Sequence, residues 1–478
     1  MKKTTRLFPT LILVACTSIG FGQTYPIVDT DVSDHYSDSK IIPAPAPGEA
    51  FFGQDASYPG TAPSYTDNLN GTITDHVTDL MWEKDMGAKI AFDEALPKAE
   101  ASSLGGYTDW RVPSIKELYS LILFTGQVKG ETAISFFIDT TYFNQPLGDV
   151  SIGEREIDAQ TWSSTEYVGL TMQGDATVFG VNFIDGRIKG YPKYKKASGI
   201  ANTMYFRMVR GNTAYGINHF ENNEDATITD LATGLMWQKS DDGIARDWEE
   251  ALAHAESLEL GGYTGWRLPN AKELQSIVDY SRSPQTTSSP AIDPIFECTE
   301  INDPDGNSGQ YPFFWTSTTH LDGANPYASA AYLAFGEGMG EMNGTLMDVH
   351  GAGCQRSDPK SGNINDYPQF WGPQGDVRYV YNYVRCVRDA SATSYVEEKT
   401  DIEINIYPNP AKDLITISPD QGLAGITIFD MQGQKVMDQP TYQNNTTLTT
   451  SCLSDGLYII KLISTEGEST TRQIVIAK

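Results

Sequence analysis

The sequence predicts an α+β fold: two copies of one module, followed by a small all-β sandwich. Three observations lead to this class. Blocks of sequence in the first half of the chain recur in the second half. Each copy has two helix-like segments early and only strand-like segments afterwards, the order expected when helices are segregated from a sheet. Beyond residue 403, apolar residues alternate with polar ones, as in half-buried strands.

The charge of the chain excludes whole classes of partner. Its 478 residues include 34 basic and 62 acidic side chains, a formal net charge of −28 that is spread along the sequence. Such a field repels nucleic acid and anionic membranes, so we expect no nucleic-acid partner. We interpret the one basic cluster as a solvated face; it consists of Arg187, Lys189, Lys193, Lys195 and Lys196.

The N-terminus has the pattern of an export signal at residues 1–22. A basic start precedes an apolar stretch too short to span a bilayer, and small residues stand before a cleavage point at Gln23. An alternative interpretation of residues 13–16 is a lipobox, which would make Cys16 a lipidated first residue. The proline-containing residues 23–65 are expected to form an extended N-terminal strap.

An internal repeat defines two modules, at residues 66–212 and 213–390. The matching blocks are residues 72–75 and 227–230, 105–113 and 261–269, and 162–165 and 315–318. The spacing between blocks changes along the chain, which indicates a duplicated domain with loop insertions and not a short solenoid. Each copy has the usual size of an independent domain.

Each copy is expected to begin with a strand and two helices. Three helix starts carry a polar residue followed three positions later by glutamate, the spacing of a capping box. These pairs are Asp247 with Glu250, Asn270 with Glu273, and Ser114 with Glu117. Pro97 lies inside the first helix of the first copy, where it removes a hydrogen bond. We therefore expect that helix to be shorter or kinked.

The C-terminal part changes its pattern. Residues 391–403 are polar and charged and are expected to be a linker. From residue 404 onwards, short segments of alternating apolar residues are separated by turns that contain glycine. Strands of this kind predict a small β-sandwich at residues 404–478.

The cysteines allow one predicted disulfide. An exported chain can form disulfides, and Cys298, Cys354 and Cys386 all lie in the second copy, with Cys452 further on. We expect a bridge between Cys298 and Cys386, which would join the base of a long loop to the last strand. The alternative is Cys298 with Cys354. None of the spacings is that of a metal site.

The long insertion of the second copy, residues 336–382, is the candidate binding region. Long loops on a rigid scaffold are where binding residues usually lie. Its aromatic and charged side chains suit stacking on sugar rings or contact with a protein. The candidate ligand-binding residues are Asp348, His350, Arg356, Tyr367 and Trp371.

A second candidate site is a cation loop in the second copy. Asp303, Asp305 and Asn307 offer oxygen ligands around Gly306. Hard cations such as calcium take carboxylate and amide oxygens. Calcium is accordingly the one cofactor that the sequence suggests, although the later ligands of a complete calcium loop are missing.

Catalytic motifs are absent from the sequence. None of the six histidines falls in a zinc-protease motif, and the chain lacks a serine nucleophile elbow. We therefore expect a protein that is not an enzyme. The many carboxylates leave open an alternative, an enzyme that acts on extracellular polysaccharide through a carboxylate pair. A structural surface protein without a small ligand is a further alternative.

The C-terminal segment resembles the type A sorting domain of the type IX secretion system of Bacteroidota. The residues that carry this resemblance are Tyr407, Pro408, Asn409, Pro410, Gly433, Gly456 and Tyr458. The resemblance implies passage across the outer membrane by the type IX secretion machinery. Release from the cell or attachment to its surface, and removal of the domain, are implied in the same way.

The two copies resemble the Lcl C-terminal domain, also called DUF1566. The resemblance rests on residues 233–238, 262–269, 272–274, 315–318 and 384–389. It implies a C-type-lectin-like fold, in which the strand of Trp237 pairs with the strand of Cys386. It also implies adhesion or carbohydrate recognition, with an extracellular glycan or protein as partner. The calcium-dependent sugar motifs of C-type lectins are absent, since Leu147 follows Gln145 and Pro146.

Overall fold

A computed structural model gives two compact units, residues 1–395 and 396–478, each described separately below. It describes residues 25–390 without 130–132, 173 and 197, and residues 404–478 without 420–422, 431–434, 441–444 and 465–468. The predicted signal peptide, Cys16, the 391–403 linker and Gly433 therefore lie outside the described residues. Within the described part, no helix is long and apolar enough to cross a membrane.

The predicted α+β class is wrong, because the chain is mostly β-sheet, with 37% strand and 11% helix. The helices were expected in the right places, but they are only one or two turns long. The insertions that interrupt the repeat form additional strands instead of loops. Many small sheets and few helices result, closer to an all-β sandwich.

The elements of the two copies follow a similar order, strands, then helices, then further strands, although some elements differ between the copies. Those of the first copy are β3 (Tyr65–Asp67), β4 (Thr72–Asp75), β5 (Leu80–Glu83), β6 (Ile90–Ala91), α1 (Phe92–Glu100), α2 (Ile115–Tyr119), β7 (Gln127–Lys129), β8 (Ala133–Ser135), β9 (Thr161–Glu166), β10 (Thr177–Asn182), β11 (Arg187–Pro192), β12 (Thr203–Phe206) and β13 (Val209–Gly211). Those of the second copy are β14 (Phe220–Asn222), β15 (Thr227–Asp230), β16 (Leu235–Gln238), α3 (Trp248–Glu256), α4 (Ala271–Ser276), α5 (Pro284–Thr287), β17 (Phe313–Thr319), β18 (Ser329–Ala334), β19 (Met339–Met342), β20 (Thr345–Asp348), β21 (Gln355–Pro359), β22 (Phe370–Trp371), β23 (Asp376–Val377) and β24 (Val387–Asp389).

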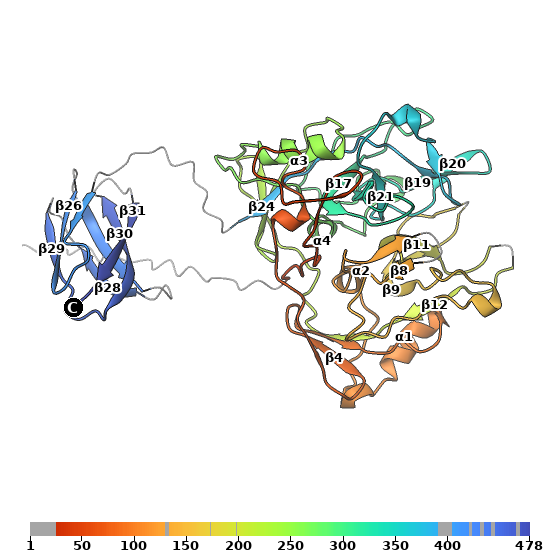
Figure 1. Cartoon of the computed structure of the whole chain (residues 1–478). Helices are drawn as coiled ribbons and strands as arrows, with labels where there is room; N and C mark the ends of the chain where they lie inside the picture. The colour runs from red at the N-terminus through yellow and green to blue at the C-terminus, as the bar shows by residue number, and fades with distance from the viewer. Residues whose placement is uncertain are drawn as a thin grey trace, which may run out of the picture. The chain divides into compact units, whose positions relative to one another are not determined.

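One eight-stranded sheet runs through both copies, in the order β17-β18-β21-β11-β10-β9-β12-β6. The copies meet where β11 pairs antiparallel with β21, with Ile188 opposite Gln355. Figure 1 shows this arrangement, with the orange-to-yellow first copy beside the green-to-cyan second copy. Because backbone hydrogen bonds continue across the repeat boundary, the two copies share a sheet.

A smaller four-stranded sheet flanks each copy, and the two small sheets have equivalent pairings. In the second copy β16 pairs with β24, with Trp237 opposite Val387, which confirms the expected pairing of the first and last strands. In the first copy β5 pairs with β13, with Trp82 opposite Val209. In each copy, this pairing places a strand from the beginning of the copy beside its last strand.

The central hydrophobic core is built from both copies. It includes Trp82 and Ile188 from the first copy and Trp237 and Leu333 from the second. Separate outer cores lie under α1 in the first copy and under α3 in the second. Buried apolar area is the main favourable contribution to folding, so the central core couples the stability of the two copies.

The helices α2 and α4 face each other across this core with reciprocal contacts. Lys116 on α2 donates to the backbone oxygen of Ser276 at 2.6 Å. Lys272 on α4 donates to the backbone oxygen of Ser120 at 2.9 Å. Each lysine belongs to one copy and each acceptor to the other, so the contact repeats as in a two-fold dimer interface.

The predicted helix starts are confirmed. Asn270 accepts from the N–H of Glu273 and forms a capping box, as does Ser114 with Glu117. The expected shortening at Pro97 is wrong: α1 has nine residues, as α3 does. Pro97 and Asp93 are both exposed, so water can satisfy the carbonyl that loses its partner.

The N-terminal strap, residues 25–64, lies along the second copy and contains β1 (His35–Tyr36), β2 (Ile41–Ile42) and a short turn of helix at Asp55–Ser57. The Asp55 carboxylate accepts from the hydroxyls of Thr30 and Thr318. Backbone oxygens of the strap accept from two buried lysines, Lys272 and Lys360. The strap therefore supplies partners that buried polar groups of the second copy require.

A buried arginine fixes the end of each copy. Arg385 is fully buried, and its guanidinium donates to the backbone oxygens of Gln238, Lys239 and Glu297 at 2.7–2.8 Å. Arg207 occupies the equivalent position in the first copy and also donates to three backbone oxygens. The basic strands at the ends of the repeats are thus structural.

We expect Arg385→Met to lower the free energy of unfolding by about 3 to 5 kcal/mol, because three buried carbonyls lose their donor. Urea unfolding followed by fluorescence measures the change. Arg155→Met is the control, since Arg155 is exposed and pairs only with Asp158; its loss should be under about 1 kcal/mol. Equal effects of the two substitutions would contradict the structural role of Arg385.

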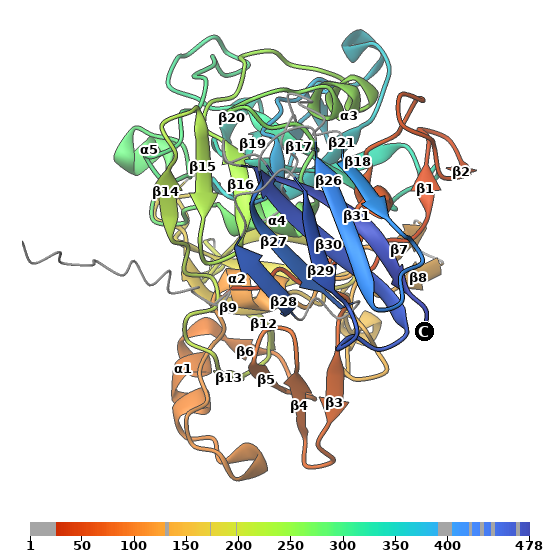
Figure 2. The ribbon, with the colours of Figure 1, turned by 90° about the vertical axis from the view of Figure 1, so that its left-hand side faces the viewer.

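The C-terminal unit is the predicted β-sandwich. Its strands are β25 (Ile404–Tyr407), β26 (Leu414–Pro419), β27 (Leu423–Phe429), β28 (Lys435–Pro440), β29 (Thr446–Thr449), β30 (Gly456–Ser464) and β31 (Ser469–Ile476). They form two sheets, β25-β26-β29 and β28-β27-β30-β31, drawn in blue in Figure 2. Ile415, Ile426 and Ile460 are fully buried between the sheets.

The Tyr407–Pro410 segment of the sandwich is held against its last strand. The Asn409 side chain accepts from the N–H of Val475 at 2.8 Å and donates to the oxygen of Gln473 at 3.1 Å. Tyr407 beside it is 54% exposed. The hydroxyl of Tyr458 donates to the oxygen of Ser454.

Candidate functional site

The insertion of the second copy folds over the place where the two copies join. Its hairpin β19–β20 and the pair β22–β23 belong to one four-stranded sheet, while β21 joins the central sheet. The side chains of the insertion therefore lie beside residues of the first copy. The insertion and the first copy therefore form one site together.

Two of the predicted residues are buried beneath the insertion. Asp348 accepts from the Tyr167 hydroxyl at 2.7 Å and from the N–H groups of His350 and Gly351. Burial raises the pKa of Asp348 to about 7. His350 lies within 2.7 Å of Asp376, and burial lowers the pKa of His350 to about 4. His350 is therefore neutral at pH 7.

Asp376 links two of the predicted residues. Its second oxygen pairs with the Arg356 guanidinium. Burial by itself would raise the pKa of Asp376, but Arg356 and His350 hold this pKa well below its usual range. The remaining Nε and Nη1 of Arg356 are buried without a hydrogen-bond partner.

The first copy contributes to the same place. Arg187 on β11 pairs with Asp322, and its Nε has no partner. Lys189 lies two residues further on the same strand face; burial, followed by the nearby Arg356, lowers the pKa of Lys189 to about 8. We call these six charged or titratable residues the junction cluster: Arg187, Lys189, Asp322, His350, Arg356 and Asp376.

Buried polar atoms without partners are concentrated in and around the junction cluster. Besides those of Arg187 and Arg356, they include Asp185 Oδ1, Tyr191 Oη and His350 Nδ1. Most buried polar atoms in folded proteins have a partner, so a local group of orphaned atoms indicates a place where water or a ligand completes the hydrogen bonds. The junction is therefore the strongest candidate site in the described part of the chain.

A small polar pocket of about 160 Å³ opens at the junction cluster. Its lining comes from both sides of the junction: Arg187, Asp322, Ser329, Tyr332, Arg356, Ser357, Asp358, Trp371, Asp376 and Arg378. Trp371 stands at this pocket with 58% of its surface exposed. We call this feature the junction pocket.

The Trp371 side chain is held in place by an arginine. The Arg378 guanidinium lies 4.7 Å from the centre of the Trp371 ring and 5.3 Å from that of Tyr367. Tyr367 in turn donates to the Ser361 oxygen at 2.7 Å. Such cation–π contacts restrain an exposed aromatic ring.

The structure brings the predicted binding residues to one region, in two layers. Asp348, His350 and Arg356 are in the inner layer, and Tyr367 and Trp371 are in the outer layer. The prediction missed Arg378 and the contributions of the first copy. The sequence shows that Arg187 and Lys189 are basic, but the proximity of these two residues to the insertion depends on the β11–β21 pairing.

The predicted cation loop forms a closed turn. Asp303 accepts from the backbone N–H and the side-chain amide of Asn307, one on each carboxylate oxygen. Asp305 is exposed at the tip of the turn. Among the described residues, no group of three or more histidine, cysteine or acidic side chains is arranged to hold a metal ion. The calcium site stays a prediction.

The predicted disulfide is wrong, because the four described cysteines are free thiols. Cys298 packs beside Arg385 at the central core, whereas Cys386 and Cys354 lie in the outer core of the second copy. Consecutive residues of an extended chain point to opposite faces, so Cys386 points away from the side where Arg385 meets Cys298. The alternative pair, Cys298 with Cys354, is not formed either, since Cys298 packs on the central core and Cys354 belongs to the outer core of the second copy.

We expect the exposed Cys452 to react with an alkylating reagent in the native protein. Burial raises the pKa of Cys354 and Cys386 far above the usual value and that of Cys298 to about 12, so these three should be protected. In denaturant without reductant all four should be alkylated. Peptide mapping by mass spectrometry measures this, and a disulfide-linked peptide pair would contradict the structure.

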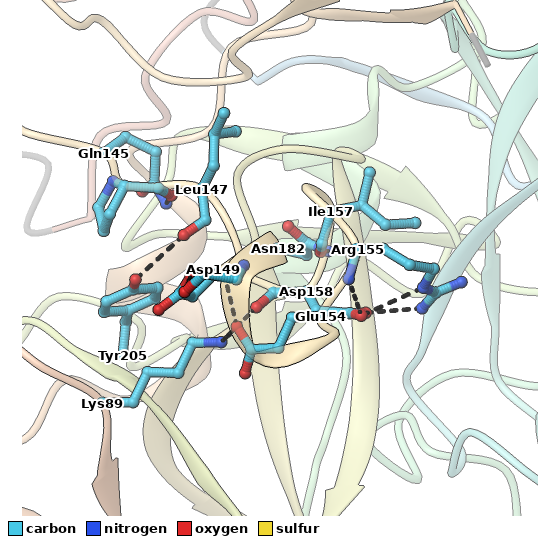
Figure 3. Close-up of polar contacts among 12 residues, drawn as sticks. Lys89, Gln145, Leu147, Asp149, Glu154, Arg155, Ile157, Asp158, Asn182 and Tyr205 are labelled. Atoms are coloured by element: carbon cyan, nitrogen blue, oxygen red, sulfur yellow. Dashed lines mark hydrogen bonds and ion pairs between the residues drawn. The ribbon is translucent and has the colours of Figure 1, made fainter. Parts of the chain in front are cut away.

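A loop of the first copy, residues 145–158, is braced by its own polar contacts (Figure 3). Lys89 donates to Glu154 at 2.5 Å and to the Asp158 oxygen at 2.6 Å, and Arg155 pairs with Asp158. The Tyr205 hydroxyl donates to the backbone oxygen of Leu147. Several polar atoms of this loop thus have protein partners, although Gln145 Oε1 is buried without one. The junction, where several such atoms gather, remains the better candidate for a ligand.

Comparison with known proteins identifies the parts of the chain. The profile of the Lcl C-terminal domain matches residues 71–210 and again 226–349, and that of the secretion system C-terminal sorting domain matches residues 405–477. A search of curated proteins found no match. The sorting domain marks the protein as secreted or displayed on the outer cell surface, after handling by the type IX secretion machinery.

Three solved structures show distant similarity. A DUF3244 family protein with an immunoglobulin-like β-sandwich fold from Bacteroides vulgatus has 16% identity over 16% of this chain and 88% of its own, with a TM-score of 0.15. CopC from Methylosinus trichosporium has 16% identity over 15% and 89%, with a TM-score of 0.13. PorZ, a surface component of the type IX secretion system of Porphyromonas gingivalis, has 9% identity over 87% and 58%, with a TM-score of 0.15.

Part of the junction pocket, including Arg187, Asp322 and Tyr332, lies in the matched segments, whereas Arg356 and Trp371 follow the second match. The domain profile covers more than half of the chain in two successive segments, one in each copy. The chain therefore belongs to the Lcl C-terminal domain family, as a tandem member that is exported with a C-terminal sorting domain.

Proposed function

We propose that this secreted or surface-displayed protein recognises an extracellular glycan at the junction pocket and serves in adhesion. The observation that carries the proposal is the exposed ring of Trp371 at the edge of a polar pocket. Sugar rings present apolar faces to aromatic side chains and hydroxyls to charged planar groups. Binding sites of this kind combine an apolar surface with a few convergent polar groups.

The polar groups of the pocket suit sugar hydroxyls. Arg356 has two unpaired nitrogens, and the carboxylates of Asp322 and Asp376 are fixed by ion pairs with arginines. Charged groups that are already oriented lose little freedom when they bind a ligand. Ser357 lies in the same lining and adds a hydroxyl.

We also propose that the protein binds its ligand without chemical turnover. The junction cluster has a neutral histidine and ion-paired carboxylates, which suit recognition. Among the described residues, the pocket lining includes no cysteine or lysine that could act as a nucleophile. Incubation with a bound glycan and analysis of its chain length tests this proposal, and shortened products would support the alternative of a polysaccharide-acting enzyme.

We expect Trp371→Ala to weaken glycan binding by about 5- to 30-fold, because loss of an aromatic anchor costs on the order of 1 to 2 kcal/mol. A glycan array with the mature chain identifies a ligand, and calorimetry measures the affinity. The Trp371→Phe variant should retain part of the affinity. Tyr194→Ala, an exposed aromatic substitution in the first copy, is the matched control and should bind normally.

Two results would contradict the proposal. One is the absence of saturable binding to any glycan on the array. The other is a ligand that binds Trp371→Ala and the wild type equally well. Repeating the measurement in chelator tests the calcium prediction at Asp303 separately, since this turn does not line the junction pocket.

A further inference from the structure

One surface of the first copy, formed by α1 and β9, lacks the cover that the strap gives to the same surface of the second copy. Leu96 on α1 is 55% exposed, whereas its repeat equivalent Leu252 on α3 is 1% exposed. Val168 after β9 is 40% exposed, whereas its equivalent Leu321 is buried. The repeat thus provides a covered and an uncovered version of one surface.

The covered version shows what this surface accommodates. The Phe51 ring of the strap packs against Trp248 on α3, with ring centres 6.3 Å apart. Four residues further along the strap, Asp55 accepts from the hydroxyl of Thr318 on β17 at 2.5 Å. The Tyr58 hydroxyl then donates to Glu256 at the end of α3. A segment of turns that ends in a short 3-10 helix therefore makes one aromatic contact through Phe51 and two polar contacts through Asp55 and Tyr58.

The uncovered version retains the hydrogen-bonding groups. Thr165 Oγ1 accepts from the N–H of Ile115 at 3.0 Å, as Thr318 Oγ1 does from Ala271. The Thr318 hydroxyl donates a hydrogen bond to Asp55, but among the residues that the structure describes none accepts from the Thr165 hydroxyl. The first copy therefore has the hydroxyl donor of Thr165 but, among the described residues, no counterpart of the Asp55 acceptor.

A pocket lies at one end of this surface, beside Thr165, the equivalent of Thr318, and none of the described residues of α1 lines it. It has a volume of about 500 Å³ and lies beside Thr165 and Arg111. Arg111 Nη1 is buried without a partner, whereas its equivalent Arg267 places both terminal nitrogens on Glu273. A second unpaired donor thus lines the same pocket.

We propose that this surface binds a turn-forming segment of another protein, laid across α1 and β9 as strap residues 49–58 lie across the second copy. The segment would carry an aromatic residue for Leu96 and, four positions later, an aspartate that accepts from Thr165. The strap of a second copy of the chain is not free for this role. Its carbonyls accept from the buried Lys272 and Lys360, and each of these lysines would lose one of its two acceptors if the strap moved.

The test uses a synthetic peptide of strap residues 49–61 as the probe and the mature chain as the receptor. We expect saturable binding by fluorescence anisotropy. Hydrogen exchange should show new protection at residues 92–100 and 161–168. Replacement of Asp55 by alanine in the peptide should weaken binding by about 10-fold, the usual effect of losing one charge-assisted hydrogen bond.

Two receptor variants make the test specific. Leu96→Glu places a charge at the aromatic contact and should abolish binding; because Leu96 is exposed, the unfolding midpoint should not change. Ile244→Glu is the matched control, an equally exposed position on the second copy, and should bind as the wild type does. No binding to the wild type, or protection confined to residues 248–256 and 313–321, would overturn the proposal.

Discussion

Residues 25–212 and 213–390, produced as separate chains, should each fail to fold. The cut divides the central sheet at the β11–β21 pairing and exposes the core that both copies build. Exposed apolar area costs about 25 cal/mol per Å², and a domain has only about 5 to 15 kcal/mol of net stability. Far-ultraviolet circular dichroism and a thermal scan measure whether a cooperative transition remains.

The buried lysines strengthen this expectation. Lys116 and Lys272 each donate to a carbonyl of the other copy, and burial lowers their pKa values to about 8 and about 7. Separation would leave each lysine without that acceptor. Co-expression of the two halves is the control and should restore a folded, one-to-one complex. A cooperative thermal transition in either half alone would contradict the prediction.

The sequence was informative where the cause of structure is local. A capping residue and the glutamate three positions later determine where α2 and α4 begin, and both starts were predicted from Ser114 and Asn270. The repeat itself located equivalent strands, and the family resemblance implied the pairing of β16 with β24. Alternation of apolar residues was enough for the C-terminal sandwich.

The contacts between the copies could not be predicted in the same way. The pairing of Ile188 with Gln355 joins residues far apart in the sequence and has no local pattern. The fold class was wrong because the helices are short and the long insertions form strands. Whether an insertion forms strands depends on partner strands elsewhere in the chain, which the sequence did not assign. The insertion was chosen because charged and aromatic residues gather in its sequence, but Arg187 belongs to the same pocket only through the shared sheet.

The strap is the second feature on which stability should depend strongly. Asp55→Ala should lower the free energy of unfolding by about 2 to 4 kcal/mol at pH 5, because the hydroxyls of Thr30 and Thr318 lose a buried acceptor. Asp55→Asn keeps an acceptor oxygen and should cost less. Urea unfolding at fixed pH measures both. A loss below 0.5 kcal/mol for the alanine variant would show that the strap contributes little there.

The same residue should give the stability a characteristic pH dependence. Burial, opposed by the two hydroxyl hydrogen bonds, raises the pKa of Asp55 to about 7, from an ordinary value near 4. Between these values the folded protein holds a proton that the unfolded chain releases. Stability must therefore fall as the pH rises through this window.

Asparagine cannot titrate, so Asp55→Asn removes this contribution. Relative to the wild type, the variant should become more stable by about 2 to 4 kcal/mol between pH 5 and pH 8. Asp348 and Asp358 also have raised pKa values, about 7 and about 6. The stability of the Asp55→Asn variant should therefore retain part of the pH dependence of the wild type. Asp305→Asn, an exposed acid, is the control for loss of charge alone. If both asparagine variants follow the wild type in parallel from pH 5 to pH 8, the buried carboxylate of the strap does not hold its proton in the folded protein.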